Sequence, residues 1–356
     1  MLPWFLAVGG AEWDEWALVA PNDAFVPVEA VHHGAAVLVA EESDEHAQAL
    51  ESRFQISASH EGVDYTVSLV IGASPVALAV LTSGEYDKYH PPFVTDETFV
   101  WLTRSEAVTT EWLEDVVAAF LFELATTTGL VFRRYKRTGP WYGPEESEGD
   151  EEWTERFRPL VFGPGTRELL NLFNSAAAAS EADHRIAGYT KVIEFVAATV
   201  VRVASFDALR VKLASRSALQ PDARFLSELK RLVESQKDWV EDKRSIELAI
   251  QTCCDAGELQ REAPPFCKGL HGLPDSSTDK QRREALADFA GRLTATRNAL
   301  AHAKPNYRPR GVECAPEDYG ELAQLAARAA EFAVRWYATS DPAMRFLPDD
   351  WGRPDS

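Results

Sequence analysis

The residues of this chain best suited to chemistry lie in one short stretch, Thr296-Arg297-Asn298-Ala299-Leu300-Ala301-His302. Arg297 carries a guanidinium, and His302, five positions later, carries an imidazole. Three further cations follow in the next eight residues, namely Lys304, Arg308 and Arg310. Guanidinium and ammonium groups gathered beside an imidazole predict a phosphate-binding site.

A helix must position these side chains. From Asp279 to Ala303 the apolar residues Leu286, Phe289, Leu293 and Leu300 recur at helical spacing, and Pro305 ends the pattern. On a helical wheel that starts at Leu286, with about 100° per residue, Arg297 falls at about +20°, inside the apolar stripe. Asn298 and His302 are four residues apart and share a neighbouring face. A guanidinium on a packed face needs a partner, so Arg297 is expected to border an interface or a cleft.

The same stretch also has a purely structural interpretation. Arg and His occur at helical spacing in many proteins, and a histidine at a helix C-terminus can interact only with the helix dipole. The basic loop after His302 favours the functional interpretation over this one.

At Arg297-Asn298-Ala299-Leu300-Ala301-His302 the sequence resembles HEPN domains, and within them the Apea-like proteins of bacteria. In these domains an Arg, a polar residue, three or more residues and a His close the penultimate main helix. A second stretch, Ser180-Glu181-Ala182-Asp183-His184-Arg185-Ile186-Ala187-Gly188-Tyr189-Thr190-Lys191-Val192-Ile193-Glu194-Phe195-Val196, is similar to an upstream helix of the same family. The resemblance covers about Gly163 to Ser340 and leaves the first half of the chain unexplained.

The resemblance implies a metal-independent endoribonuclease that needs no cofactor and acts as a toxin or an antiphage defence effector. It also implies a homodimer through the helical bundle, with Arg297 and His302 of two copies lining a shared cleft. His302, with a reference pKa of about 6.5, would move protons at the ribose 2′-hydroxyl and the leaving 5′-oxygen. Arg297 would hold the phosphate, Asn298 would orient either group, and Lys304, Arg308 and Arg310 would bind further phosphates.

A second class of function stays open: a HEPN module without turnover that binds RNA, a nucleotide or a protein partner. Another chemistry of the family, modification of a Tyr two residues after the His, does not fit, because that position is Lys304. Tyr307 stands five residues beyond His302.

The charge of the chain divides unevenly between its halves. Residues 1–155 contain 7 basic and 28 acidic side chains, whereas residues 156–356 contain 29 and 28, which together give the net charge of −20. The second half can therefore bind RNA but offers little long-range attraction for it. The acidic first half is the expected docking region for a regulatory protein partner.

Composition and residue patterning predict a multidomain chain: an N-terminal α+β domain, a sheet with a helix, followed by an all-α helical bundle. The resemblance implies that this bundle is of HEPN type. We expect an acidic α+β domain at 1–143, an acidic linker at 144–162, the bundle at 163–340 and a tail at 341–356. The basic and aromatic stretch 133–142 before the linker could stack on bases, but pairing with nearby acidic residues explains it better.

Alternation and turn residues predict strands at 54–59, 65–71, 76–81 and 99–103, with a hairpin turn at Glu61-Gly62. A helix is expected at 110–127, ended by Gly129. In the second half we expect helices at 166–178, 180–204, 206–215, 222–235, 238–253, 279–303 and 316–339, with Ser180 as a cap and a loop from 257 to 277.

The four cysteines, Cys253, Cys254, Cys267 and Cys314, are expected to be free thiols. A zinc site from Cys254, Cys267 and His271 is disfavoured, because their spacing matches no paired zinc-ligand pattern. No secretory signal and no membrane-spanning segment is recognised, which predicts a cytoplasmic protein that does not associate with membranes.

Overall fold

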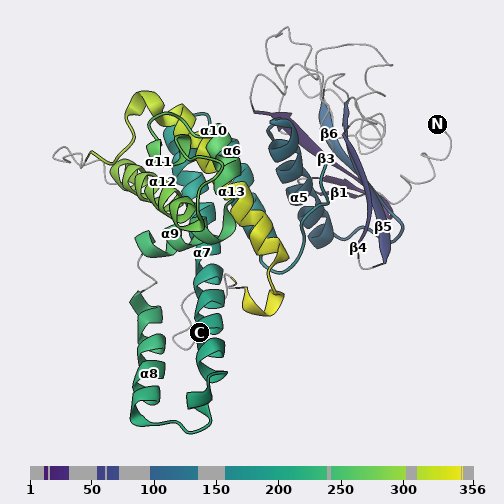
Figure 1. Cartoon of the computed structure of the whole chain (residues 1–356). Coiled ribbons are helices and arrows are strands. Elements are labelled where there is room, and N and C mark those ends of the chain that lie inside the picture. Colours follow the sequence, from purple (N-terminus) through teal and green to yellow (C-terminus); the bar gives the residue numbers. More distant parts are fainter. Residues whose placement is uncertain are drawn as a thin grey trace. The chain divides into compact units, whose positions relative to one another are not determined.

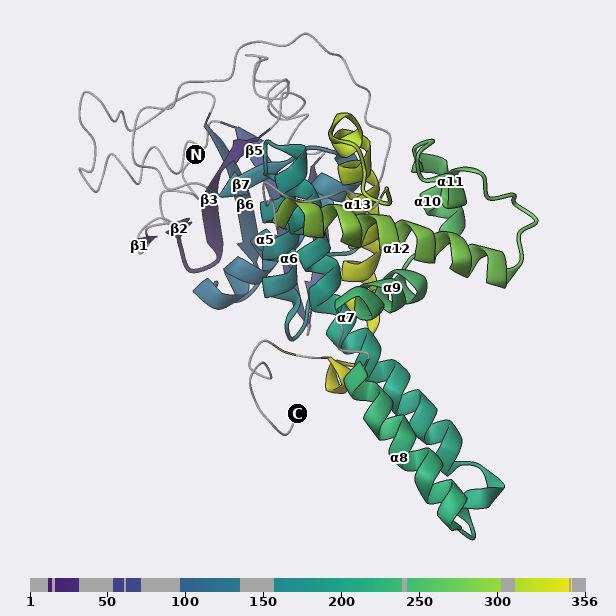
Figure 2. The ribbon, with the colours of Figure 1, turned by 90° about the vertical axis from the view of Figure 1, so that its left-hand side faces the viewer.

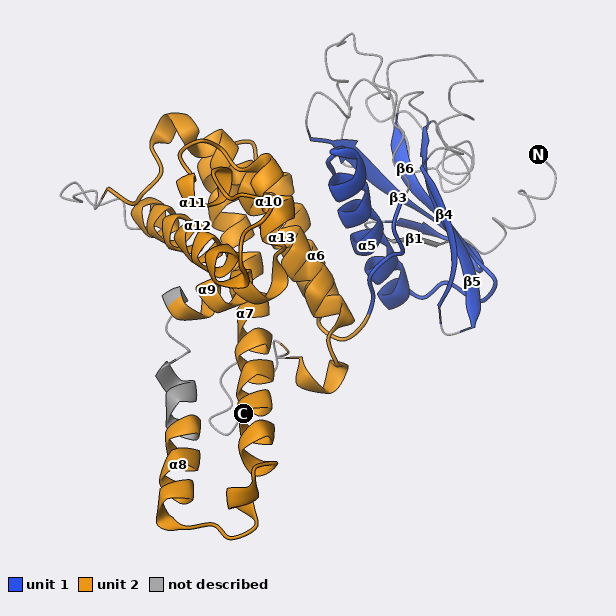
Figure 3. Cartoon of the chain, viewed as in Figure 1, with its two compact units in different colours: residues 1–162 blue, residues 163–356 orange. Residues whose placement is uncertain are grey.

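The computed structural model describes residues 12–14, 17–31, 54–60, 62–71, 97–134, 157–238, 242–301, 311–345 and 347, without the side chains of 12–14, 233–238 and 242–243. The chain divides into two compact units, Met1–Phe162 and Gly163–Ser356 (Figure 3). The described end of the predicted linker belongs to the first unit. There the backbone N–H of Arg158 donates to the buried carboxylate of Glu123, at 2.7 Å.

The first unit contains an antiparallel sheet with one helix against it (Figure 1). The strands follow the order β1-β2-β3-β6-β5-β4, and β7 also pairs with β3. Their bounds are β1 Glu12–Asp14, β2 Ala17–Val19, β3 Asp23–Ala30, β4 Gln55–His60, β5 Val63–Ile71, β6 Thr98–Arg104 and β7 Phe132–Arg134. The helix α5, Thr110–Thr128, begins at Thr109, whose side chain accepts from the Trp112 N–H, and ends at Gly129 in the left-handed region, as its sequence predicts.

The core of this unit is formed by every second residue of the strands, whose side chains point to the same face of the sheet. Tyr65, Val67 and Leu69 of β5 are buried, as are Val116 and Phe120 of α5. The ring of Tyr65 meets that of Trp112 edge to face, with centroids 5.5 Å apart, and so joins the sheet to the helix. The hairpin predicted at residues 61–62 is confirmed, because His60 pairs with Val63 across it.

Four of the described strands were not predicted, and β3 shows why. Its residues Ala24–Val28 are all buried, and it pairs with β2, β6 and β7. Pro27 lies inside the strand and has no backbone N–H to donate. A proline within an apolar run indicates an edge strand or no strand, so the sequence alone does not predict β3 as a central strand. The strand predicted at 76–81 lies outside the described residues.

The second unit is largely helical, as the composition predicts (Figure 3). Its helices are α6 Thr166–Ala177, α7 Ala182–Leu213, α8 Ala223–Asp238, α9 Asp242–Cys253, α10 Ala256–Glu262, α11 Lys268–His271, α12 Asp279–Ala301 and α13 Tyr319–Thr339. Three short 3-10 turns, η1 Arg216–Ala218, η2 Pro316–Asp318 and η3 Pro342–Met344, accompany them. Helix α7 is the centre of the unit, since it packs against α6, α9, α12 and α13.

Two predictions about these helices are wrong. The helices expected at 180–204 and 206–215 are one continuous helix, α7, because Ser205 is buried within it and neither Gly nor Pro interrupts the run there. The cap is also misplaced: α7 starts after Glu181, which makes no side-chain capping bond, rather than after Ser180.

The loop expected from 257 to 277 contains two short helices. The carboxylate of Asp255 accepts from the N–H groups of Gly257 and Glu258, at 2.8 and 2.9 Å, and so begins α10. Helix α11 follows after Pro264 and Pro265. Pro264 and Pro265 therefore separate two helices of one or two turns each, while Gly257 and Gly269 lie within these helices.

Close packing fixes α7 against α6. A Cβ added at Gly188 of α7 would lie 2.6 Å from the Cβ of Ala176, so the two backbones approach at a point where only glycine fits. Among the described residues, no helix is both long enough and apolar enough to cross a membrane.

Candidate functional site

Helix α12 holds the first two residues of the predicted site. It begins with a capping box, in which Gln281 Oε1 accepts from the Thr278 N–H at 2.9 Å and Thr278 Oγ1 accepts from the Gln281 N–H at 3.4 Å. Leu286, Phe289 and Leu293 are buried along one face, as predicted. Arg297 extends this packed face and has only 19% of its side chain exposed. Its predicted position on the apolar stripe is therefore observed.

Arg297 is held by two neighbours. Its guanidinium forms an ion pair with the carboxylate of Glu194, which comes from α7. Its Nη1 donates a hydrogen bond to Oδ1 of Asn298, at 2.9 Å. Burial lowers the pKa of the guanidinium, yet an arginine stays charged at neutral pH because its pKa starts so high. The site thus contains a fixed positive charge with a carboxylate and an amide against it.

The guanidinium retains capacity for another ligand. It has five N–H donors, and the partners that the described residues provide are one carboxylate and one amide oxygen. The Glu194 side chain is 29% exposed, so the pair borders solvent rather than the centre of the bundle. Arg297 therefore lies at the border of the packed core, with 19% of its side chain exposed.

The remaining predicted residues, His302, Lys304, Arg308 and Arg310, lie outside the described residues. The structure nevertheless describes the residues on both sides of this segment. Helix α12 ends at Ala301, and the chain returns at residues 311–314 against the same helix. Arg292 Nη1 donates to the carbonyl of Val312 at 3.1 Å, and the N–H of Cys314 donates to Oγ1 of Thr296 at 2.8 Å. The described residues on both sides of 302–310 therefore lie at the last turns of α12.

Glu194 is the residue that sequence reasoning missed. It lies in the second stretch that supports the family resemblance, but no role was assigned to it. A signal was present, because Glu194 interrupts the apolar run from Val192 to Ala204, just as Arg297 interrupts the apolar stripe of α12. Opposite charges on the packed faces of two helices are candidates for a pair, although only the fold shows that these two meet.

Other residues of the two stretches are structural or exposed. Tyr189 is buried with its ring 5.3 Å from that of Phe173, and burial raises its pKa to about 12, so it stays a neutral phenol. Lys191 points to the exposed side of α7. Neither joins Arg297.

The four cysteines lie in three separate segments of the second unit. All four are free thiols, and among the described residues no group of three or more His, Cys, Asp or Glu side chains could hold a metal ion. Cys254 Sγ lies 3.8 Å from the carbonyl of Ala329, and His271 Nδ1 lies 2.8 Å from that of Ala263. Burial raises the pKa of both Cys253 and Cys254, so these two stay protonated at neutral pH.

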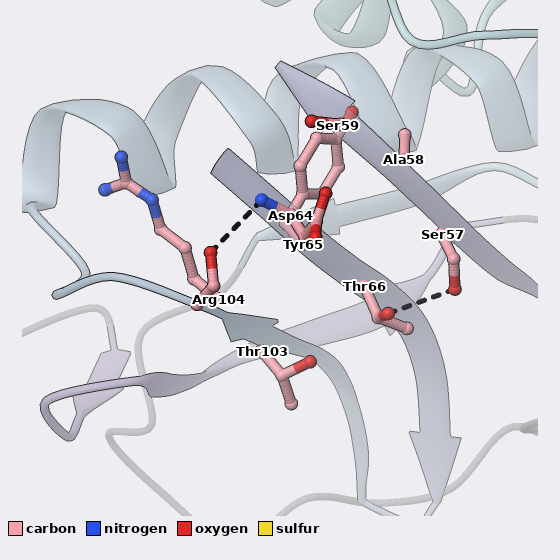
Figure 4. A pocket seen from close by; sticks show the side chains of 9 residues that line it. Ser57, Ala58, Ser59, Asp64, Tyr65, Thr66, Thr103 and Arg104 are labelled. Atoms are coloured by element: carbon pink, nitrogen blue, oxygen red, sulfur yellow. Dashed lines mark hydrogen bonds between the residues drawn. The ribbon is translucent and has the colours of Figure 1, made fainter. Parts of the chain in front are cut away.

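A second polar surface lies on the sheet of the first unit (Figure 4). It is an open pocket of about 470 Å³ across β4, β5 and β6, rich in hydroxyl groups. The hydroxyls of Ser57 and Thr66 bond to each other at 3.0 Å, and Ser105 Oγ accepts from the Asp64 N–H at 3.1 Å. The described lining contains no nucleophile hydrogen-bonded to a general base, so the pocket does not compete with the α12 site.

Comparison with known proteins found no matching family model, no similar curated protein and no similar solved structure. The candidate site therefore rests on the residues and the geometry of this chain.

Proposed function

We propose that this protein is a metal-independent endoribonuclease of HEPN type, with its site at the end of α12. The observation that carries the proposal is the placement of Arg297 on the packed face of α12, paired with Glu194 and bonded to Asn298. A half-buried guanidinium held in one orientation, five residues before a histidine, suits the binding of a phosphodiester.

In the proposed reaction the 2′-oxygen of a ribose attacks the adjacent phosphorus, and the bond from phosphorus to the 5′-oxygen breaks. His302 takes the proton from the 2′-hydroxyl or gives one to the leaving oxygen, and two copies of the chain supply both roles. Arg297 stabilises the charge that develops on the phosphoryl oxygens. Lys304, Arg308 and Arg310 bind phosphates along the strand, and Asn298 orients the guanidinium.

The reaction needs the 2′-hydroxyl, which gives a direct test. The purified chain is incubated in EDTA with a short RNA and with the same sequence carrying single deoxyribose substitutions. We expect cleavage of the RNA and none at a deoxyribose position. Cleavage that ignores the substitution, or that EDTA abolishes, would contradict the proposal. Binding without any product at every protein concentration would favour the second candidate, a module that binds RNA without turnover.

Glu194 has a distinct role in this proposal, because it orients Arg297 without touching the substrate. We expect Glu194→Gln to lower kcat about ten- to a hundredfold, since glutamine cannot hold the guanidinium by charge and small displacements are costly. KM for RNA should fall or stay constant, because a negative charge near the phosphate is removed. Steady-state kinetics measures both.

The matched control for this variant is Glu284→Gln, which makes the same change at an exposed carboxylate of α12. It should change neither parameter. A Glu194→Gln enzyme with full kcat and only a lower melting temperature would show that the pair is purely structural.

A further inference from the structure

Exposed apolar residues gather on one feature of the second unit. Among the described residues six large hydrophobic side chains are exposed, and five of them lie between positions 206 and 226, from Phe206 at 48% to Leu219 at 84%. This segment is the end of α7, the tip with η1, and the start of α8. We call residues 202–232 the α7–α8 arm, which stops at the last residue of α8 whose side chain is described. Figures 1 and 2 both show α8 beside the end of α7, extending away from the other helices of the second unit.

The charge of the arm is opposite to that of the rest of the chain. Residues 202–232 contain seven basic and three acidic side chains, which gives a net charge of +4. The whole chain carries −20, so the residues outside the arm carry −24. The arm therefore attracts a negatively charged partner in a protein that otherwise repels one.

The exposed apolar side chains of the two helices meet on one face of the arm. With about 100° per residue, Phe206 lies at about +60° and Leu213 at about +40° from Leu209 on α7. On α8, Leu226 lies at about +100° from the buried Phe225. In an antiparallel helix pair, equal rotations away from the contact line reach the same side. These residues therefore share a face, which we call the plus face.

Cations border the plus face on both helices. Arg210 lies at about +100° from Leu209, and Lys230 lies at about +140° from Phe225. Arg210 pairs with Asp207 within the chain, at 3.9 Å, but the two side chains are 83% and 65% exposed. Such an exposed pair is weak, and a guanidinium has five N–H donors, so Arg210 can bind a further carboxylate.

The opposite face of the arm is polar, which supports this assignment. On α7, Lys212 lies at about −60° from Leu209. On α8, Glu228 lies at about −60° and Arg231 at about −120° from Phe225. The side chains of Lys212 and Glu228 form an ion pair. The wheel thus places on one side two residues that the structure brings together.

A pocket continues the plus face at the root of the arm. Its volume is about 380 Å³, and it lies where α7 meets the end of α13. Trp336 and Met344 give it apolar walls, and Asp341 adds a carboxylate. The residues of α7 in its lining all lie between about +60° and +160° from Leu209: Val203, Phe206, Asp207 and Arg210. The pocket therefore opens on the plus side of the arm and forms one surface with the plus face.

We infer that the plus face binds an acidic amphipathic helix of another protein, packed across α7 and α8 as the third helix of a bundle. The apolar stripe of this helix covers Phe206, Leu213 and Leu226 and places one large side chain in the root pocket. Its carboxylates lie beside Arg210 and Lys230, which fixes its position along the arm by charge.

A helix of this kind fits the surface better than a nucleic acid does. Four of the five exposed apolar side chains of the arm are aliphatic, and an aliphatic chain offers no ring on which a base can stack. Asp207 and Asp341 at the pocket repel a phosphate but accept a neutral or basic residue of a helix. From Val203 to Leu213 the face is about 15 Å long, so about three turns of helix cover it. This inference concerns a protein partner and does not depend on RNA cleavage.

The test is a selection of helical peptides by the full chain. A display library of amphipathic helices, random in charge beside an apolar stripe, is selected on the unaltered chain and counter-selected on Leu213→Glu. We expect the retained peptides to be acidic. If no peptide distinguished the two chains, or if the retained peptides were basic, the inference would be overturned.

Substitutions on the two faces locate the binding site of a retained peptide, whose affinity is measured by fluorescence anisotropy. Leu226→Glu should weaken binding at least about a hundredfold, because it buries a charge in an apolar contact. Val211→Glu is the matched control, since Val211 is also exposed but lies at about −160° from Leu209, away from the plus face. Arg210→Glu should weaken binding about tenfold, whereas Arg231→Glu, the same change of charge on the opposite face, should not.

The same variants distinguish a protein helix from other anionic ligands. A short single-stranded RNA, and vesicles with equal parts of phosphatidylserine and phosphatidylcholine, are each titrated with the full chain. Neither should depend on the plus face, so Leu226→Glu and Val211→Glu should affect each of them equally. RNA or vesicle binding that Leu226→Glu weakens and Val211→Glu leaves intact would assign the arm to that ligand and overturn the inference.

Discussion

Arg297→Ala is expected to lower the rate of RNA cleavage about a thousandfold, because the variant loses the charge that stabilises the phosphoryl oxygens in the transition state. The free energy of unfolding should change little. The carboxylate left behind, Glu194, is 29% exposed and can be hydrated once its partner is gone. Single-turnover cleavage of a labelled RNA measures the rate, and thermal unfolding measures the stability.

Two further variants make the result specific. Arg297→Lys keeps the charge but loses the planar fork of donors, so it should recover only part of the activity. Arg283→Ala removes an exposed arginine from the same helix and should behave like the unaltered chain. Full activity in Arg297→Ala would rule out the proposed site.

His302→Ala is the second variant with a large expected effect. A general acid or base typically contributes about 100- to 10,000-fold to a rate, so cleavage should fall by a factor in this range. RNA affinity should hold, because the charges of Arg297, Lys304, Arg308 and Arg310 remain. Rapid-mixing kinetics and a binding titration separate the two quantities.

His184→Ala is the control for this variant, since His184 is exposed at the beginning of α7. It should cleave RNA normally. If His302→Ala lost affinity and rate in proportion, the imidazole would bind substrate rather than move protons.

Local patterns predicted those elements whose ends are marked by their own residues. The apolar face of residues 110–127 with Gly129 at its end predicts α5, and the apolar stripe before Pro305 predicts α12. The sequence predicts two helices on either side of Ser205, whereas α7 is continuous there and packs against five other helices, α6, α8, α9, α12 and α13. Strand β3 is not predicted, because the proline at position 27 is unusual inside a buried strand.

The sequence likewise predicts one part of the candidate site and not the other. The position of Arg297 on the packed face follows from helical spacing, and the structure places it there. Its partner Glu194 is separated from it by about a hundred residues, and only the packing of α7 against α12 brings the two together. Sequence periodicity gives the face of each helix, but which faces meet depends on the whole bundle.

The most direct test of the proposed activity is the chemistry of the product ends. The purified chain is mixed with total RNA in EDTA, and the new ends are identified by enzymatic labelling and mass spectrometry. We predict cleavage that EDTA does not inhibit, that leaves 2′,3′-cyclic phosphate and 5′-hydroxyl ends, and that disappears in Arg297→Ala. Products with a 5′-phosphate, or cleavage that persists in Arg297→Ala, would contradict the account.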